Sequence, residues 1–459
     1  MQAYDRSDRL EERPPTGNIE DVQKDNQDVL SVDGTHLLSP ENHTMALIIG
    51  SNFKPLPLID VNNPRNLQSD ILPAPRAQIS WLPPMAQYLF QFYLSETMRL
   101  TVPSSYAKNE ICRFLVPMSF REPSLLYAVM AFAAVHLDAM GKLPGNSKRR
   151  IDSLHWTSIR SLRQLLNESD PVSQAVALAT TRTLCQAQIY GGTSLWRVHL
   201  DGARAILESI QSMNQATNDG CRNSTNTEFL SSWFHNAEAL AALSPTGLFS
   251  DQRQAKCQSD SGVFFDIYGG VMSDLPALFR AVGALVAKGR RRNCTTDVVH
   301  EAASLVQEIR LRITRDSVEN LPLEPNILLS LPANDIHNYA LSNSGFLYTA
   351  LLHIYCGAQA LSPLAFEVQF CVDQIIQLAR NMSCEHGLSP KVLLVAPLFT
   401  AGLCAAGSAR ESIRDALEDI GEWMRTPHLS KTLALLERVW QQYPDGSQNA
   451  GAWEYFGES

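Results

Sequence analysis

Two segments of the sequence are apolar on nearly every helical face, and they restrict the possible folds more than any other feature. They are Glu122–Asp138 (EPSLLYAVMAFAAVHLD) and Gly345–Leu361 (GFLYTALLHIYCGAQAL). A helix that is apolar all round has to be covered on several sides by other elements. The longest apolar runs, Pro123–Leu137 and Val392–Ala406, are short of the roughly 20 residues that cross a bilayer. We therefore expect no membrane span, and both segments to lie inside a large helical body.

Other segments have apolar residues on one side only, as expected of helices that cover such a core. Their apolar residues recur every three or four positions, the spacing of a helical stripe. These segments are Met85–Leu100, Ile151–Leu166, Val299–Ile313, Glu411–Arg425 and Leu429–Tyr443. Alternating strand patterns and a fixed-period repeat are both missing. The sequence predicts an all-α fold, a large multi-helix bundle or irregular helical array.

The start of the chain differs in composition from the rest. Residues 1–30 hold eight acidic and four basic residues with almost no apolar periodicity, and Pro, Asn and Asp are frequent up to about residue 85. Such a composition favours a disordered segment. We expect a poorly ordered leader at 1–84 and one helical domain at 85–459, with the polar stretches 214–227, 250–262 and 314–335 as surface loops.

Charge and cysteine usage limit the classes of function. The formal net charge is −9, whereas domains that bind nucleic acid usually present a basic face. The nine cysteines are scattered without a C-x-x-C pair, which is typical of a reducing compartment. The charged start lacks the apolar core of a signal peptide. The composition indicates an intracellular protein without a broad phosphate-binding surface.

Sequence motifs of common enzymes are not found. There is no G-x-G-x-x-G, G-x-x-x-x-G-K-[ST], H-E-x-x-H or G-x-S-x-G pattern. Asn334–Asn338 resembles a magnesium-binding motif of terpene cyclases but lacks its later oxygen ligands. Cys384–His386 is better explained as a turn than as a metal site. We expect no catalytic, cofactor-binding or metal-binding residue.

The segment from Trp196 to Ala203 carries the most information. Trp196, His199 and Ala203 share a helical face, and Leu200 is beside them. Gly202 lowers helix stability by about 1 kcal/mol relative to Ala, which suggests a close helix contact. We expect a packing seam in which His199 is a hydrogen-bonded core residue; the alternative is a ligand-contacting or catalytic histidine.

A basic cluster follows the apolar segment Leu278–Ala287. It consists of Lys288, Arg290, Arg291 and Arg292. Positive charges stabilise the C-terminal end of a helix, and short basic runs also act as nuclear import signals. We favour a helix terminus and keep import as the alternative.

Four segments resemble one known family. The W-x-x-H-L-x-G-A pattern of Trp196–Ala203 is similar to a helix motif of the fungal-specific transcription factor domain, the regulatory region of fungal binuclear zinc-cluster transcription factors. Pro123–Leu137 resembles that domain's P-x-L-L-x-A-V-x-A-x-A-A-x-H-L helix. Phe265–Gly270 and Pro397–Gly402 resemble later segments in the family's order. Together they cover about residues 85–443.

This resemblance implies a transcription regulator located in the nucleus. It implies control of metabolic genes, including secondary-metabolite clusters, with other transcription regulators or a DNA-binding partner as contacts and a small molecule as a further effector. The family's six-cysteine zinc cluster has no counterpart here, because no cysteine precedes Cys112. We therefore do not expect direct DNA binding: either a partner supplies it or an upstream exon is missing.

The residues themselves leave another class open. A non-transcriptional helical scaffold, or an enzyme with an unrecognised site inside the bundle, would have the same composition and periodicity.

Overall fold

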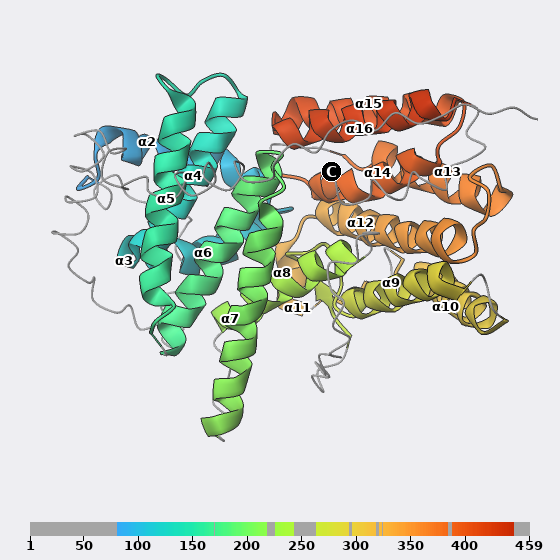
Figure 1. Ribbon diagram of the computed structural model, residues 1–459, viewed down its shortest axis with the longest axis horizontal. Coiled ribbons are helices and arrows are strands. Elements are labelled where there is room, and N and C mark those ends of the chain that lie inside the picture. Colours follow the sequence, from blue (N-terminus) through green and yellow to red (C-terminus); the bar gives the residue numbers. More distant parts are fainter. Residues whose placement is uncertain are drawn as a thin grey trace, which may run out of the picture. The chain divides into compact units, whose positions relative to one another are not determined.

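The computed structural model describes residues 80–168, 170–217, 225–242, 263–292, 296–317, 321–323, 325–383 and 388–444. These residues are almost entirely helical (Figure 1), which confirms the predicted all-α class. The α-helices are α2 (Pro84–Ser95), α3 (Ser105–Arg121), α4 (Pro123–Ala139), α5 (Ser147–Leu165), α6 (Pro171–Tyr190), α7 (Trp196–Thr217), α8 (Thr225–Ala242), α9 (Leu275–Arg292), α10 (Thr296–Arg315), α11 (Pro325–Ser330), α12 (Ala333–Leu352), α13 (Phe366–Asn381), α14 (Val395–Cys404), α15 (Ser408–Met424) and α16 (Pro427–Gln442). Shorter elements are η3 (Thr97–Leu100), η5 (His353–Ala358), η6 (Pro390–Leu394), β1 (Phe265–Asp266) and β2 (Val271–Met272).

The first described helix, α2, begins at Pro84, where a proline in the first turn loses no helical hydrogen bond. Residues 1–79 of the predicted leader lie outside the described residues, so the leader and its boundary at residue 85 stay predictions. Along the described ranges, every helix is too short or too polar to cross a membrane.

The two segments predicted to be central are buried. Within α4, Leu125 and Phe132 have no exposed surface, and α2, α5 and α6 cover the helix. The second segment spans the end of α12 and the wider π-helical turn η5, which packs on α9. Both predictions of buried helices are confirmed, although the second helix changes its winding at His353.

The structure adds a third central helix, α6, which the sequence pattern did not single out. Its N-cap is Asp170, whose carboxylate accepts hydrogen bonds from the backbone N–H of Val172 and Ser173 at 3.0 Å. Nearly all side chains from Ser173 to Gln188 are buried, including polar ones. The helix therefore needs internal partners for its polar groups.

Part of that need is met within α6 itself. The hydroxyl of Thr181 donates to the carbonyl of Ala177 at 2.8 Å, and the hydroxyl of Thr183 donates to the carbonyl of Ala179 at 2.8 Å. Each acceptor is one helical turn before its donor. At the C-terminal end, the Tyr190 ring lies 4.9 Å from the ring of His428 in α16, edge to face. The α6 helix is thus anchored to the C-terminal helices by an aromatic contact.

A second contact joins α4 to the end of α15. His136 Nε2 lies 3.2 Å from the carbonyl oxygen of Met424, and its Nδ1 lies 3.2 Å from Thr97 Oγ1. Arg99 donates to the Trp423 carbonyl at 2.9 Å. His136 is only 1% exposed, so these bonds lie in the interior.

One feature differs from the expectation that strands would be absent. The strands β1 and β2 form a small antiparallel hairpin, with Phe265 opposite Met272 and Asp266 opposite Val271. Its turn uses Gly270 at φ +67°, a conformation that favours glycine. The hairpin packs on Tyr339, whose hydroxyl lies 2.8 Å from the Ile267 carbonyl oxygen. Strands of two residues are too short for an alternating pattern to be detected.

Candidate functional site

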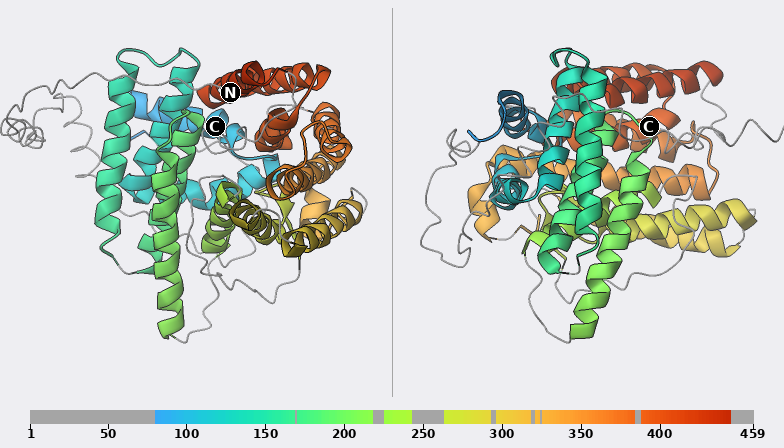
Figure 2. Two further views of the ribbon diagram at one scale, coloured as in Figure 1. Left: turned by 45° about the vertical axis from the view of Figure 1, so that its right-hand side comes forward. Right: turned by 60° about the vertical axis from the view of Figure 1, so that its left-hand side comes forward.

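The helix that carries the Trp196–Ala203 motif is α7, and it packs along α6, which also contacts α5 (Figure 2). Leu200 and Ala203 are 1% and 0% exposed, whereas Trp196 and His199 are half-buried and Gly202 is exposed. Leu200, Ala203 and Leu207 form the buried face of α7. The motif therefore divides between two adjacent faces of the helix.

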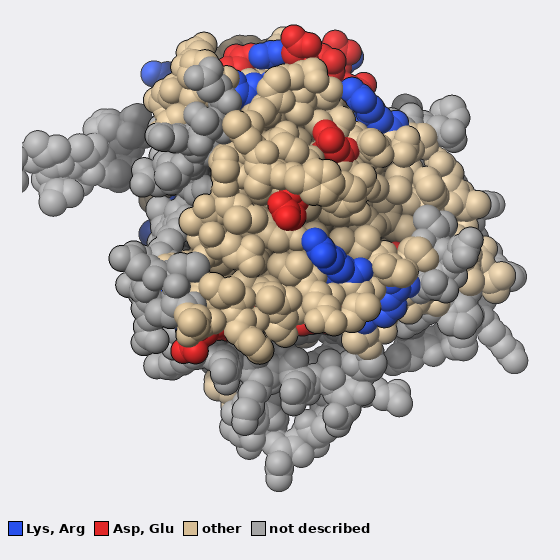
Figure 3. Space-filling view, turned by 90° about the vertical axis from the view of Figure 1, so that its right-hand side faces the viewer, with Lys and Arg blue, Asp and Glu red and all other residues tan. Residues whose placement is uncertain are grey.

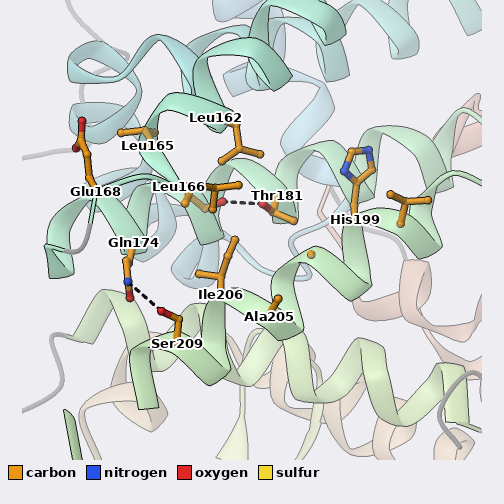
Figure 4. A pocket seen from close by; sticks show the side chains of 13 residues that line it. Leu162, Leu165, Leu166, Glu168, Gln174, Thr181, His199, Ala205, Ile206 and Ser209 are labelled. Atoms are coloured by element: carbon orange, nitrogen blue, oxygen red, sulfur yellow. Dashed lines mark hydrogen bonds between the residues drawn. The ribbon is translucent and has the colours of Figure 1, made fainter. Parts of the chain in front are cut away.

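The second face of α7 lines a cavity of about 350 Å³ between α5, α6 and α7 (Figure 4), and the cavity is partly open to solvent, since its lining residues Leu166 and Val198 are exposed. This volume is within the range of small-molecule sites. We call it the α5–α7 cavity. Its lining residues are Leu162, Leu165, Leu166, Glu168, Gln174, Ala177, Thr181, Val198, His199, Gly202, Ala205, Ile206 and Ser209.

Polar groups are placed at the two ends of the α5–α7 cavity, with aliphatic side chains between them (Figure 4). At one end, Gln174 Nε2 donates to Ser209 Oγ at 3.3 Å. Glu168 at this end accepts a hydrogen bond from the Ser173 hydroxyl at 2.6 Å. His199 stands at the other end. An occupant would meet an apolar middle and hydrogen-bonding groups at each end.

Burial keeps the histidines of this region uncharged. The pKa of His199 is lowered to about 4, mainly by burial and to a smaller extent by the nearby His155. Burial also lowers the pKa of His155, although Asp152 opposes the shift. Because neutral imidazole has one N–H donor and one acceptor nitrogen, His199 can donate one hydrogen bond and accept another at neutral pH.

Two expectations about the motif are corrected by this geometry. His199 is not a hydrogen-bonded core residue: its half-buried ring lines the α5–α7 cavity, and no hydrogen bond joins it to the described parts of the chain. Gly202 is not at a close helix contact, because it lies one position around the helix from the buried face. The fully buried small residue of the motif is Ala203 instead.

The α6 side of the cavity is what sequence reasoning missed. Gln174 and Thr181 belong to a segment whose apolar pattern is interrupted by polar residues, so it was not recognised as central. Leu162, Leu165 and Leu166 were found as part of an amphipathic helix, but their partner helix was not. The signal that could have found α6 is the Asp170–Pro171 pair, a typical helix start.

The basic cluster lies at the end of α9, as the helix-terminus interpretation expects. Lys288 Nζ lies 2.7 Å from Glu301 Oε2 of α10. The side chains of Arg290, Arg291 and Arg292 lie outside the described residues, so the import signal stays a prediction.

The remaining polar motifs have structural roles or fall outside the description. Asn334 donates to the Ser383 hydroxyl at 2.7 Å, and Asn338 donates to the Ser383 carbonyl at 3.1 Å, so both hold the segment after α13. Cys384–His386 lies outside the described residues. Among the residues that are described, no cluster of His, Cys, Asp and Glu could hold a metal ion.

Surface charge offers no broad cationic area on the face shown in Figure 3. The Lys and Arg side chains there are few and are interspersed with Asp and Glu. Several cations are held in ion pairs, such as Arg204 with Glu238 at 2.9 Å and Arg312 with Asp274 at 2.8 Å. Cations paired in this way contribute less to phosphate binding.

Comparison with known proteins identifies the helical body. The family model of the fungal specific transcription factor domain matches residues 88–459, which include α7 and the helices around the cavity. Neither the curated proteins nor the solved structures contain a match. The resemblance found in the four motifs is thus confirmed over most of the chain. The protein belongs to the fungal-specific transcription factor domain family, and its role is that of a transcription regulator.

Proposed function

We propose that the chain acts in the nucleus as a non-enzymatic regulator, through contacts with other transcription regulators or a DNA-binding partner. The observation that carries the proposal is the family match over residues 88–459. We assign residues 85–459 to the regulatory domain and residues 1–84 to a leader outside it. A helical domain of this kind can recruit a partner through helix-in-groove contacts.

Charge supports an indirect route to DNA. Specific recognition needs an element that fits a groove and several cations on phosphates. The net charge is −9, and the basic run Lys288–Arg292 ends a helix in which Lys288 is already paired with Glu301. This chain therefore depends on another molecule for its choice of promoter.

The genes under control follow from the family resemblance alone. We propose a metabolic pathway, in particular a secondary-metabolite gene cluster, whose expression the chain adjusts in response to a small-molecule effector. The α5–α7 cavity supports this, because it is large enough for such a molecule.

A reporter assay tests the regulatory role. The full chain, fused to an unrelated DNA-binding domain, should change transcription from a promoter that carries the matching site. A gel shift of the unfused chain at near-physiological salt should show weak binding, equal for promoter fragments and scrambled duplexes. An inert fusion would refute regulation, and tight selective binding would refute the indirect route.

Localisation tests the nuclear assignment. A fluorescent fusion of the full chain should collect in the nucleus, and replacing Arg290, Arg291 and Arg292 with Gln should reduce that accumulation. A cytoplasmic wild-type chain would refute the nuclear proposal. A triple variant that stays nuclear would show that the basic cluster only ends α9.

A further inference from the structure

Gly202 sits in the interior of α7 without any of the usual structural reasons for a glycine. Glycine lowers helix stability relative to alanine, so a mid-helix glycine calls for an explanation. Gly202 does not have a positive φ. A Cβ built on it would meet one atom, Thr181 Cγ2, at 3.8 Å, which is ordinary van der Waals contact. Neither backbone conformation nor a close approach explains this residue.

The space that Gly202 leaves open belongs to the α5–α7 cavity. Gly202 lines it together with His199 and Ile206, which lie three positions before and four after it, on the same face of α7. Thr181 faces the same space across from Gly202, and its hydroxyl is already bonded to the Ala177 carbonyl. Because the Thr181 hydroxyl already donates its hydrogen bond within α6, Thr181 contributes its methyl group to the lining. A side chain at position 202 would extend into the cavity.

The lining selects the charge of an occupant. It contains no Lys or Arg among the described residues and one carboxylate, Glu168, at one end. His199 at the opposite end is neutral because burial lowers its pKa. An anionic group would therefore find no counter-ion, and burying an unpaired charge is costly.

The lining also selects the polarity of an occupant. Leu162, Leu165, Ala177 and Ile206 form the apolar middle. Hydrogen-bonding groups are available at His199 and at the Gln174–Ser209 pair. These features fit a mainly apolar molecule that carries a hydroxyl, amine or carbonyl group at an end.

We propose that the α5–α7 cavity is a binding site for a neutral, mainly apolar aromatic or alicyclic molecule with a hydrogen-bonding group directed at His199, and that Gly202 keeps the site open. Binding itself is independent of the regulatory role. That the ligand acts as an effector rests on the proposed function.

The test uses two fluorescent probes with the same ring system. N-phenyl-1-naphthylamine is neutral and carries one N–H donor, whereas 8-anilinonaphthalene-1-sulfonate adds a sulfonate. The full chain is titrated with each probe. We expect saturable binding of the neutral probe and at least about tenfold weaker binding of the sulfonate, since the lining offers it no cation.

Variants at the cavity locate the bound probe. Gly202→Leu should weaken binding of the neutral probe at least about tenfold, because the new side chain fills the site. Gly202→Ala should keep most of the affinity. Glu208→Leu adds the same side chain at an exposed position of α7 outside the lining and should bind like wild type. Thermal melts followed by circular dichroism verify that each variant folds.

Ala205→Phe is a second way to fill the cavity, since Ala205 is exposed on α7 and lines the same space. If Gly202→Leu does not fold, loss of probe binding in a folded Ala205→Phe chain supports the site. A third change, His199→Lys, places a charge at the polar end and should also weaken binding of the neutral probe.

Several results would overturn the proposal. These are no saturable binding of the neutral probe, equal binding by wild type and a folded cavity-filling variant, or sulfonate binding as tight as that of the neutral probe. The reporter assay separates this from the proposed function. A chain that binds the probe but leaves the reporter unchanged refutes regulation and keeps the site. A chain that changes the reporter while Gly202→Leu binds like wild type refutes only the site.

Discussion

Acidification should destabilise the fold through His136, and the size of the effect can be worked out. The pKa of His136 is lowered to about 4, mainly by burial; the charges of Arg99, Arg425 and Lys142 act in the same direction, and the hydrogen bond to the Met424 carbonyl opposes them. In the unfolded chain the pKa of histidine is about 6.5. Because the folded pKa is the lower one, the stabilisation is complete above about 6.5 and is lost as pH falls towards 4.

Between about pH 7.5 and 5.5 the unfolded chain takes up nearly one proton at this position, while the folded chain takes up almost none. The free energy of unfolding should therefore fall by about 1.4 kcal/mol from His136 alone. Urea unfolding at both pH values, followed by circular dichroism, measures the total fall. We expect His136→Gln to be less stable at pH 7.5 but to lose about 1.4 kcal/mol less than wild type on acidification.

A matched control is His300→Gln, which removes an exposed histidine of α10. It should leave the difference between the two pH values close to that of wild type. If His136→Gln lost as much stability as wild type on acidification, the buried neutral state of His136 would be refuted.

Three further predictions concern packing. Ala203→Trp should lower the free energy of unfolding by more than about 2 kcal/mol, because Ala203 has no exposed surface and the larger side chain has no room. His199→Gln at the cavity wall should change that free energy by less than about 1 kcal/mol. Equal melting temperatures for the two variants would contradict this ranking. Gly402→Ala should lower the free energy of unfolding by about 1–3 kcal/mol, since the added Cβ would lie 2.7 Å from buried Leu436. Gly202→Ala should instead raise it by up to about 1 kcal/mol, and a destabilised Gly202→Ala chain would show that the residue serves packing after all. Chemical unfolding of the purified variants measures each change.

Apolar segments were predictable from the sequence, and polar segments with buried surroundings were not. The α4 segment and the end of α12 were found because few apolar helices of that length can lie at a surface. The α6 helix was missed because Thr181 and Thr183 look polar in the sequence, while in the helix their hydroxyls bond back to carbonyls of the preceding turn. Burial of a hydroxyl depends on local bonds that a periodicity count does not include.

The candidate site shows the same limit at finer scale. The motif residues of α7 were recognised, but positions 199 and 202 were assigned to the seam that 200 and 203 form. Adjacent residues on a helix point in directions that differ by about 100°. Assigning a residue to the neighbouring face therefore changes its predicted role from packing to lining a cavity. Only the position of α5 and α6 shows which face of α7 is covered and which borders the cavity.

The length and continuity of α6 have a mechanical consequence. Gln174 and Thr181 border the α5–α7 cavity, and Tyr190 at the far end of the same helix touches His428 of α16. From Gln174 to Tyr190 the helix is about 24 Å long at 1.5 Å per residue. A hydrogen-bonded helix is stiff over such a distance. A small tilt of α6 at its cavity end would therefore move its Tyr190 end sideways. The α6 helix therefore connects the cavity lining rigidly to α16, the last helix among the described residues.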